Sequence, residues 1–414
     1  MSEIVNKSCG LDIHKHFFIA TIFSISGEKQ QQRFARDDDG ILALKNWVIS
    51  EKCDVVACES TSDFWVPIYD SLIKHLPVII GNARDMKAFT HKKTDKIDSE
   101  VIAQLALNKM IQASRIFPKD HREFRSYVRL RHKLVQKRTD IKNEAHAILA
   151  PEMFNLNDVL ADIFGKNGIS ILSGITSGKS TDQIIESLSP NVRKKGILIR
   201  EILDREISQS AAVRLQVCLD LIKHLDDEVK SLEREIFNYA YGEHKREMEI
   251  LMSVPGIGEL GAATLIAEIE NFKDFSSGDK LASWLGVVPN VYQSADKSYN
   301  GKITKRGSKE ARWILTQIAQ AAARKKNNKL KEFFNRKKKS IGHAKAIIAL
   351  ARKITTIIWH LITNDEMYED ETGYQKGEIQ KRKIVETEIF SVDERIKIIS
   401  GIIAIMGKEE GEST

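Results

Sequence analysis

Strand-like and helix-like stretches alternate over the first hundred residues, and this alternation constrains the fold more than any other feature of the chain. The stretch Leu11–Phe23 is rich in Ile, Phe and Thr and ends at the turn Ser26-Gly27. Asp54–Cys58 and Val78–Ile80 are short apolar runs typical of buried strands. Helical patterns cover Ile41–Val48, Phe64–Leu76 and Asp95–Leu107. Strands that alternate with helices predict a layered α/β domain.

From Arg122 onward the pattern is helical and basic. Five cations recur at helical spacing and predict one positive ridge, which either follows a nucleic-acid backbone or faces solvent. They are Arg122, Arg125, Arg129, Lys133 and Lys137. A second long helical stretch begins near Val192, and apolar residues within it step by three and four from Leu215 to Ile236. Such a seam over three heptads predicts either a coiled coil or a helical hairpin within the chain.

A third unit opens at Met252 and contains the glycine-rich run Val254–Gly258. A loop is expected from Pro289 to Gly307, followed by helices dense in Lys and Arg. The expected domains are residues 1–160, an α/β domain that includes the basic helix; 161–245, a helical or coiled-coil connector; 246–364, a mainly α domain with a helix-hairpin-helix element; and 365–414, an acidic appendage.

Charge is distributed unevenly along the chain. Its 64 Lys and Arg residues against 57 Asp and Glu give a formal net charge of +7 at pH 7. From Asp365 to the end there are 13 acidic and 7 basic residues, so residues 1–364 have a formal charge of +13. A basic body with an acidic tail indicates a polyanionic partner.

The remaining composition favours a soluble intracellular protein. The four cysteines are scattered and have no zinc-ligand spacing, which indicates small buried residues in a reducing compartment. No apolar signal sequence opens the chain. The apolar stretch Ala346–Ile362 is interrupted by Arg352 and Lys353, so we expect no membrane span.

Four acidic residues form the strongest candidate site. Asp12 lies in the first strand, Glu59 follows the second buried strand, and Asp95 and Asp98 lie three apart on one helix face. Each alone is compatible with a helix cap or a solvated side chain. Together they can form an oxygen-ligand cluster for two Mg²⁺ ions that act on a phosphodiester. The order of these elements resembles an RNase H or RuvC-type nuclease core.

The run Gly256–Gly261 matches the dinucleotide fingerprint G-x-G-x-x-G. That fingerprint requires a preceding strand, whereas here the preceding residues are helical. A helix-hairpin-helix fits better, with a tight turn at Gly256 and Gly258 and a helix N-terminus open to a phosphate. A purely structural turn between helices remains the alternative.

A third motif combines a serine, a tyrosine and a cationic cluster, which suits the handling of a phosphodiester. Its residues are Tyr292, Ser294, Lys302, Lys305 and Arg306. From the residues alone, Ser294 is either a loop hydroxyl or a nucleophile.

Two sets of motifs, in the right order, resemble the two domains of one transposase family. The N-terminal set is Gly10–Lys15, Glu59–Thr61, Lys93–Asp98 and the end of the basic helix, Arg138–His146. The C-terminal set is Val254–Gly258, Leu285–Pro289, Tyr292–Ser294 and Gly301–Gly307. The chain is similar in these motifs to the insertion-sequence one-ten family, and the resemblance spans Gly10 to Ala323.

This resemblance implies a RuvC-like DEDD domain that binds Mg²⁺ through Asp12, Glu59, Asp95 and Asp98. It also implies a transposase domain in residues 246–364 with Ser294 as covalent nucleophile, and a coiled coil that assembles a dimer or tetramer. Family members recombine donor and target DNA under the direction of an element-encoded bridge RNA. One departure is Ala295, because the family often has glycine after this serine.

The expected function is therefore DNA strand cleavage and exchange for an insertion sequence, in the cytoplasm and nucleoid of a prokaryotic cell. One alternative is an Mg²⁺-dependent endonuclease or junction resolvase in which water is the nucleophile. Another is a non-catalytic nucleic-acid scaffold, which would leave the acidic set unexplained.

Overall fold

The computed structural model describes residues 4–60, 62–83, 86, 98–294, 297–305 and 307–370, and for 290–302 only the backbone. The chain divides into two compact units, residues 1–122 and 123–414. The division lies within the basic helix, whereas the sequence analysis assigned that whole helix to the first domain. The helix is a single 31-residue element, and most of its length packs on later helices, so it belongs mainly to the second unit.

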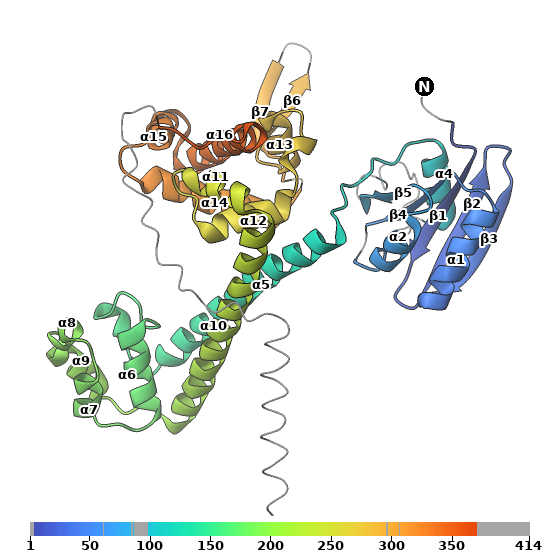
Figure 1. Cartoon of the computed structure of the whole chain (residues 1–414). Helices are drawn as coiled ribbons and strands as arrows, with labels where there is room; N and C mark the ends of the chain where they lie inside the picture. The colour runs from blue at the N-terminus through green and yellow to red at the C-terminus, as the bar shows by residue number, and fades with distance from the viewer. Residues whose placement is uncertain are drawn as a thin grey trace, which may run out of the picture. The chain divides into compact units, whose positions relative to one another are not determined.

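The first unit is a mixed α/β layer (Figure 1). Its five-stranded sheet has the order β3-β2-β1-β4-β5, in which β2 is antiparallel to both neighbours and β1, β4 and β5 are parallel. The strands are β1 Lys7–Ile13, β2 Phe17–Ser24, β3 Lys29–Ala35, β4 Val55–Glu59 and β5 Val78–Gly81. The helices are α1 Asp38–Ser50, α2 Val66–Leu72 and α4 Ser99–Leu107.

Helices cover both faces of this sheet. Leu11 and Cys58 share a buried cluster with residues of α1 and α2 on one face. Val55 and Ala57 pack with apolar residues of α4 on the other face. The expected strand Leu11–Phe23 is in fact parts of two strands joined by a turn, because the chain reverses between Ile13 and Phe17.

The second unit is mainly helical. Its elements are α5 Lys119–Leu149, η1 Leu156–Asp158, α6 Lys166–Thr176, α7 Thr181–Glu186, α8 Pro190–Arg193, α9 Gly196–Leu203, α10 Gln209–Glu243, α11 Lys245–Ser253, α12 Glu259–Ile269, η2 Phe272–Asp274, α13 Gly278–Trp284, β6 Pro289–Ser294, β7 Lys297–Ile303, α14 Lys309–Arg324, α15 Lys329–Ile341 and α16 His343–Asn364. The expected loop between Pro289 and Gly307 is therefore mostly a two-stranded hairpin.

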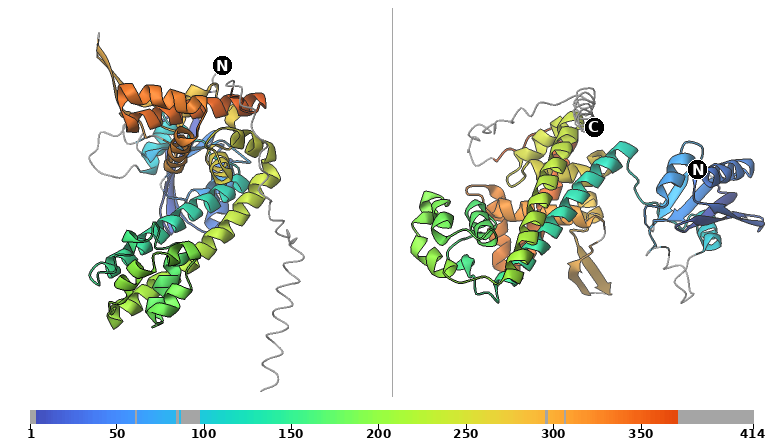
Figure 2. Two further views of the ribbon diagram at one scale, coloured as in Figure 1. Left: turned by 90° about the vertical axis from the view of Figure 1, so that its left-hand side faces the viewer. Right: turned by 90° about the horizontal axis from the view of Figure 1, so that it is seen from below.

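The two long helices α5 and α10 pack side by side and antiparallel (Figures 1 and 2). Arg131 is bonded to Glu233, and Arg138 is bonded to Asp226, so the residue number rises along one helix as it falls along the other. Most of the heptad seam of α10 is buried within the chain, at Leu215, Cys218, Ile222, Val229 and Ile236. Of the two alternatives for this seam, the structure shows the helical hairpin.

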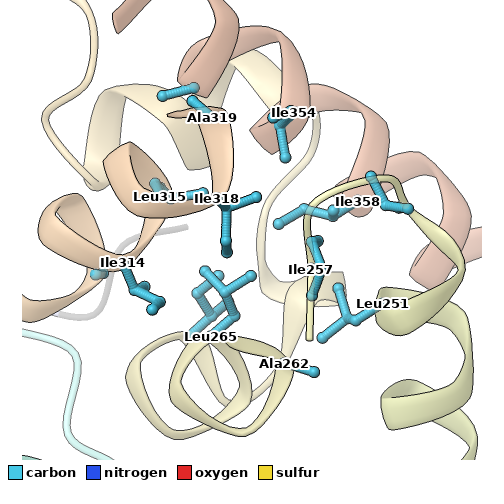
Figure 3. Close-up of a cluster of buried hydrophobic side chains, with 14 of the residues drawn as sticks. Leu251, Ile257, Ala262, Leu265, Ile314, Leu315, Ile318, Ala319, Ile354 and Ile358 are labelled. Carbon is cyan, nitrogen blue, oxygen red and sulfur yellow. The ribbon is translucent and has the colours of Figure 1, made fainter. Parts of the chain in front are cut away.

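The core of the C-terminal part is built around α12. Every residue of α12 from Gly261 to Ile269 is buried. Leu251 of α11, Leu265 of α12, Ile318 of α14 and Ile354 of α16 converge there (Figure 3). Helix α16 is long and apolar enough to cross a membrane by length and composition alone, but its apolar side belongs to this core.

The first residues of the expected acidic appendage contact the helices around this core. The backbone N–H of Tyr368 donates to Ser253 Oγ at 2.8 Å, and Arg246 Nε donates to Asp365 Oδ1 at 2.6 Å. Asp365 and Tyr368 therefore tie the chain after α16 to α11, and the expected appendage beyond residue 370 lies outside the described residues.

Candidate catalytic residues and nucleic-acid contacts

Asp12 projects from the end of β1 on the face of the sheet that α4 covers. Two residues with the same parity along β1 fix this assignment, because side chains alternate between the faces of a strand. Ser8 Oγ donates a hydrogen bond to the carbonyl oxygen of Ala103 in α4 at 2.8 Å. A Cβ on Gly10 would lie 2.1 Å from the carbonyl oxygen of Ser99, so only glycine allows α4 to pack this closely.

Glu59 lies beside Asp12 on the same face. Strand β4 pairs in parallel with β1, and Leu11 stands opposite Cys58. One residue further along both strands the register brings Asp12 next to Glu59. Because Val55 and Ala57 pack with α4, the alternation of β4 directs Glu59 toward the α4 face.

Asp98 completes the set from the N-terminus of α4. Its Oδ1 accepts a hydrogen bond from the backbone N–H of Val101 at 2.9 Å, so Asp98 is the N-cap of the helix. Ser99 lies over Gly10 and Ala103 lies over Ser8, so α4 runs opposite to β1 and its N-terminus points toward the Asp12 end. Three of the four predicted acids therefore lie at one end and on one face of the sheet.

Within the described part of the chain, the three acids do not by themselves form a complete metal-binding site. No group of three His, Cys, Asp or Glu side chains among the described residues is placed to hold a metal ion. Asp95, the fourth predicted ligand, lies outside the described residues. The donors are carboxylate oxygens, which is the ligand type that Mg²⁺ prefers, so the chemistry of the set fits this ion.

His14 is a neighbour of Asp12 that the sequence analysis did not select. Its Nε2 lies 3.1 Å from Asp12 Oδ2, and its ring lies 4.6 Å from the ring of Phe17. His14 lies in the turn that follows β1, so its position beside Asp12 depends on that turn and not on the alternation of a strand.

Ser294 is the last residue of β6, at the tip of the β6–β7 hairpin. It is paired with Lys297, and the two residues between them lie outside the described range. Tyr292 pairs with Tyr299 two residue pairs before the tip, and Lys302 lies in β7. At the base, the N–H of Thr304 donates to the carbonyl of Val288 at 3.0 Å. Beyond it, Lys305 is exposed, and Arg306 lies outside the described residues.

The glycine-rich run forms a tight turn between α11 and α12. Gly256 has φ +94°, and a Cβ there would lie 2.7 Å from both Ala322 N and Ile318 O, so this glycine packs against α14. Gly258 is exposed at the N-cap of α12 and has open space where a Cβ would be. A helix rather than a strand precedes the run, so the dinucleotide fold is absent at this place. A phosphate contact at Gly256 and Gly258 stays a prediction.

The predicted basic ridge is split by its own ion pairs. Arg122 Nη2 lies 2.6 Å from Asp70 Oδ2. Arg125 and Arg129 both bind Glu268, whose side chain is fully buried, at 2.7 and 2.8 Å. These three arginines are paired with acids within the chain, so the ridge is not one continuous row of solvated cations, and its contact with nucleic acid stays a prediction. The exposed members of the ridge are Lys133 and Lys137.

Comparison with known proteins identifies the family. A model named for the DEDD domain of IS110 and described as "Transposase" matches residues 9–153, and a model described as "Transposase IS116/IS110/IS902 family" matches residues 248–335. Together they cover more than half of the 414 residues, in the order expected from the motifs. The chain belongs to the IS110/IS116/IS902 family of transposases.

Relatives of this transposase align along much of its length. A probable family 20 transposase of Pseudomonas aeruginosa is 24% identical over 67% of this chain and 74% of its own. The transposase for the insertion sequence element IS1111A of Coxiella burnetii is 24% identical over 67% of this chain and 68% of its own. A pilin gene-inverting protein of Moraxella bovis is 27% identical over 36% of this chain and 48% of its own.

The two matched regions of the transposase contain the two candidate site regions. Residues 9–153 include the three acids at the end of the sheet, and residues 248–335 include the glycine turn and Ser294. The region between them, with α6 to α9 and all of α10, is matched by neither model. The two regions that match the family models are therefore the regions in which the sequence predicts chemistry.

Proposed function

We propose that this transposase cuts and rejoins DNA strands through a covalent serine–DNA intermediate, with Mg²⁺ bound by the four acids. The observation that carries the proposal is the common position of Asp12, Glu59 and Asp98 at one end and on one face of the sheet. The strand order β3-β2-β1-β4-β5 supports the RuvC-like fold that the resemblance implies. Asp95 is the fourth ligand in this proposal.

The protein's own residues hold this set in position. The N-cap bond to Val101 fixes the side chain of Asp98, and His14 Nε2 lies 3.1 Å from a carboxylate oxygen of Asp12. When bound, two Mg²⁺ ions would stabilise charge on the attacking and leaving oxygens of a phosphodiester. A bound divalent cation would also offset the mutual repulsion of neighbouring carboxylates.

Ser294 is the proposed nucleophile. Its oxygen forms a bond to the phosphorus, the bond to the 3′-oxygen breaks, and that oxygen leaves as a hydroxyl after taking up a proton. A serine hydroxyl needs a base. Apart from Asp296, which lies outside the described residues, the charged side chains of the hairpin are cations, and these cannot accept its proton. We therefore assign this task to a carboxylate of the acidic set, from the same chain or from another copy. The phosphodiester between serine and DNA conserves the energy of the broken bond, so the strand can be rejoined without another energy source.

The partners follow from the same proposal. Donor and target DNA are the substrates, and a bridge RNA selects them, as the family resemblance implies. A dimer or tetramer assembles the strands. The alignment with a pilin gene-inverting protein supports strand exchange rather than simple hydrolysis, because inversion requires broken ends to be rejoined.

Denaturing gels that retain covalent adducts test the proposal. The wild-type chain, incubated with DNA carrying the element's ends, its RNA and Mg²⁺, should yield a protein–DNA adduct. Ser294→Ala should abolish the adduct. Asp12→Ala, Glu59→Ala, Asp95→Ala or Asp98→Ala should each lower the cleavage rate about a thousandfold, equivalent to about 4 kcal/mol. Excess EDTA should have the same effect on the wild type.

Two outcomes would contradict parts of this proposal. If Ser294→Ala still nicks DNA at the wild-type rate to a free 5′-phosphate, water is the nucleophile and the protein is an Mg²⁺-dependent endonuclease. If the wild type cleaves in excess EDTA, the acids do not act through a metal. Ser298→Ala is the matched control, since this serine lies in the same hairpin and should retain the adduct.

A further inference from the structure

Helix α15 has an unusual concentration of positive charge. Its 13 residues include six cations and one acid, Glu332. Four of the cations follow one another in the chain, from Arg336 to Lys339, and all four are exposed. We call these four residues the α15 basic surface. Exposed cations continue on both sides, with Lys326 before the helix and Lys345 in α16 after it.

A solvated helix face does not account for this surface. The long helix α10 is also largely exposed, and it mixes 4 cations with 7 acids. In the described part of the chain, no ion pair joins any residue from Arg336 to Lys339 to an acid. Lys338 and Lys339 in the last turn interact favourably with the negative end of the helix dipole. That effect does not require four adjacent cations, which repel one another.

A membrane surface does not fit either. A basic helix that binds lipid needs a free apolar face to insert. The apolar side of α15 is already used, because Leu330 and Phe334 are buried in the core of the unit. The partly buried Phe333 lies 5.6 Å from the Arg336 guanidinium and 5.8 Å from Lys337 Nζ, so even its ring is covered by cations.

We propose that the α15 basic surface binds the phosphodiester backbone of double-helical nucleic acid. This rests on the proposed function, and it adds a contact surface outside both candidate site regions. Four successive residues of an α-helix span about 300° around its axis, so the charges reach phosphates on either side of a groove. Such contacts position a duplex and do not read its sequence.

Binding measured against salt concentration tests this proposal. The full-length chain is titrated with a 30-base-pair DNA duplex and with an RNA duplex of the same sequence, in EDTA so that no cleavage interferes. Each phosphate contact contributes about 0.9 to the slope of log K against log salt. The variant with Arg336, Lys337, Lys338 and Lys339 all changed to Gln should lose about 3 from this slope with at least one of the duplexes.

The matched control removes the same charge from a mixed face. Its changes to Gln are at Arg214, Lys223, Lys230 and Arg234, four exposed cations of α10. It should lose less than about 1 from the slope, because these cations have acids around them. A charge-preserving variant, Lys337→Arg with Lys338→Arg and Lys339→Arg, should keep the wild-type slope.

Loss with one duplex only identifies DNA or RNA as the partner. Equal losses in the α15 and α10 variants would show an effect of net charge alone and would overturn the proposal, as would an unchanged slope with both duplexes. Thermal unfolding of each variant checks the fold. Because binding is measured without cleavage, the result is independent of whether Ser294 or water attacks the phosphate.

Discussion

At the scale of single residues, Glu268 explains why the basic ridge is not one continuous row of solvated cations. It is the one acid in an otherwise apolar stretch of α12, and its side chain is fully buried. Burial opposes its ionisation, but hydrogen bonds from Arg129 and the charge of Arg125 outweigh burial and lower its pKa. The sequence shows Glu268 as an acid within an apolar stretch. The sequence could not identify its partners Arg129 and Arg125, which are 139 and 143 residues away along the chain.

Removing this carboxylate should destabilise the second unit. Glu268→Ala removes the buried carboxylate that binds two partly buried guanidinium groups, so we expect a loss of about 3 kcal/mol in the free energy of unfolding. Urea titration followed by circular dichroism measures it. Glu228→Ala, at an exposed position of α10, is the control and should change the value by less than about 0.5 kcal/mol. A similar loss in both variants would mean that Glu268 has no special role.

The same acid predicts a dependence on pH. The folded pKa of Glu268 is below its unfolded value, so its ionised form stabilises the fold at neutral pH. That contribution is complete above the unfolded pKa of about 4.5 and is lost as the pH falls toward the folded pKa. The wild type should lose more stability than Glu268→Gln between pH 6 and pH 4.

At the scale of elements, hydrophobic pattern predicted what is buried and missed what is exposed. The alternation of β4, β5 and α4 was recognised because their residues are apolar. Strand β3 was missed, since its sequence KQQQRFA has one buried residue and lies at the sheet edge. The β6–β7 hairpin was taken for a loop, because its two-residue connection, Ala295-Asp296, has none of the glycine or asparagine that marks such turns.

Two substitutions in the glycine turn between α11 and α12 test at which position packing requires glycine. Gly256→Ala places a Cβ 2.7 Å from the backbone of α14 at a φ of +94°, so it should destabilise the second unit by about 2 kcal/mol or more. Gly258→Ala meets no atom within 4 Å and should cost less than about 1 kcal/mol. Chemical unfolding compares the two. Equal stabilities would show that Gly256 is not required by packing.

At the scale of the whole molecule, the order of the two site regions could be predicted and their supporting structure could not. The motifs gave the acids at strand ends and the serine in a later domain. They could not show that α5 pairs with α10, because that pairing rests on contacts between residues about a hundred positions apart, such as Arg131 and Glu233. The division at Arg122 also follows from packing, since each unit has its own buried clusters.

Separate cores predict separate responses to mutation. Gly10→Ala forces a Cβ to within 2.1 Å of the α4 backbone, so it should loosen the first unit alone. Gly256→Ala should loosen the second unit alone. Hydrogen–deuterium exchange read by mass spectrometry would show faster exchange in peptides from residues 4–83 and 98–118 in one variant and from 245–364 in the other. Gly10→Ala should also lower the cleavage rate, since α4 positions Asp98 beside Asp12, while binding of duplex DNA should remain near the wild-type value. Faster exchange spread over both units in either variant would mean that the two cores unfold as one.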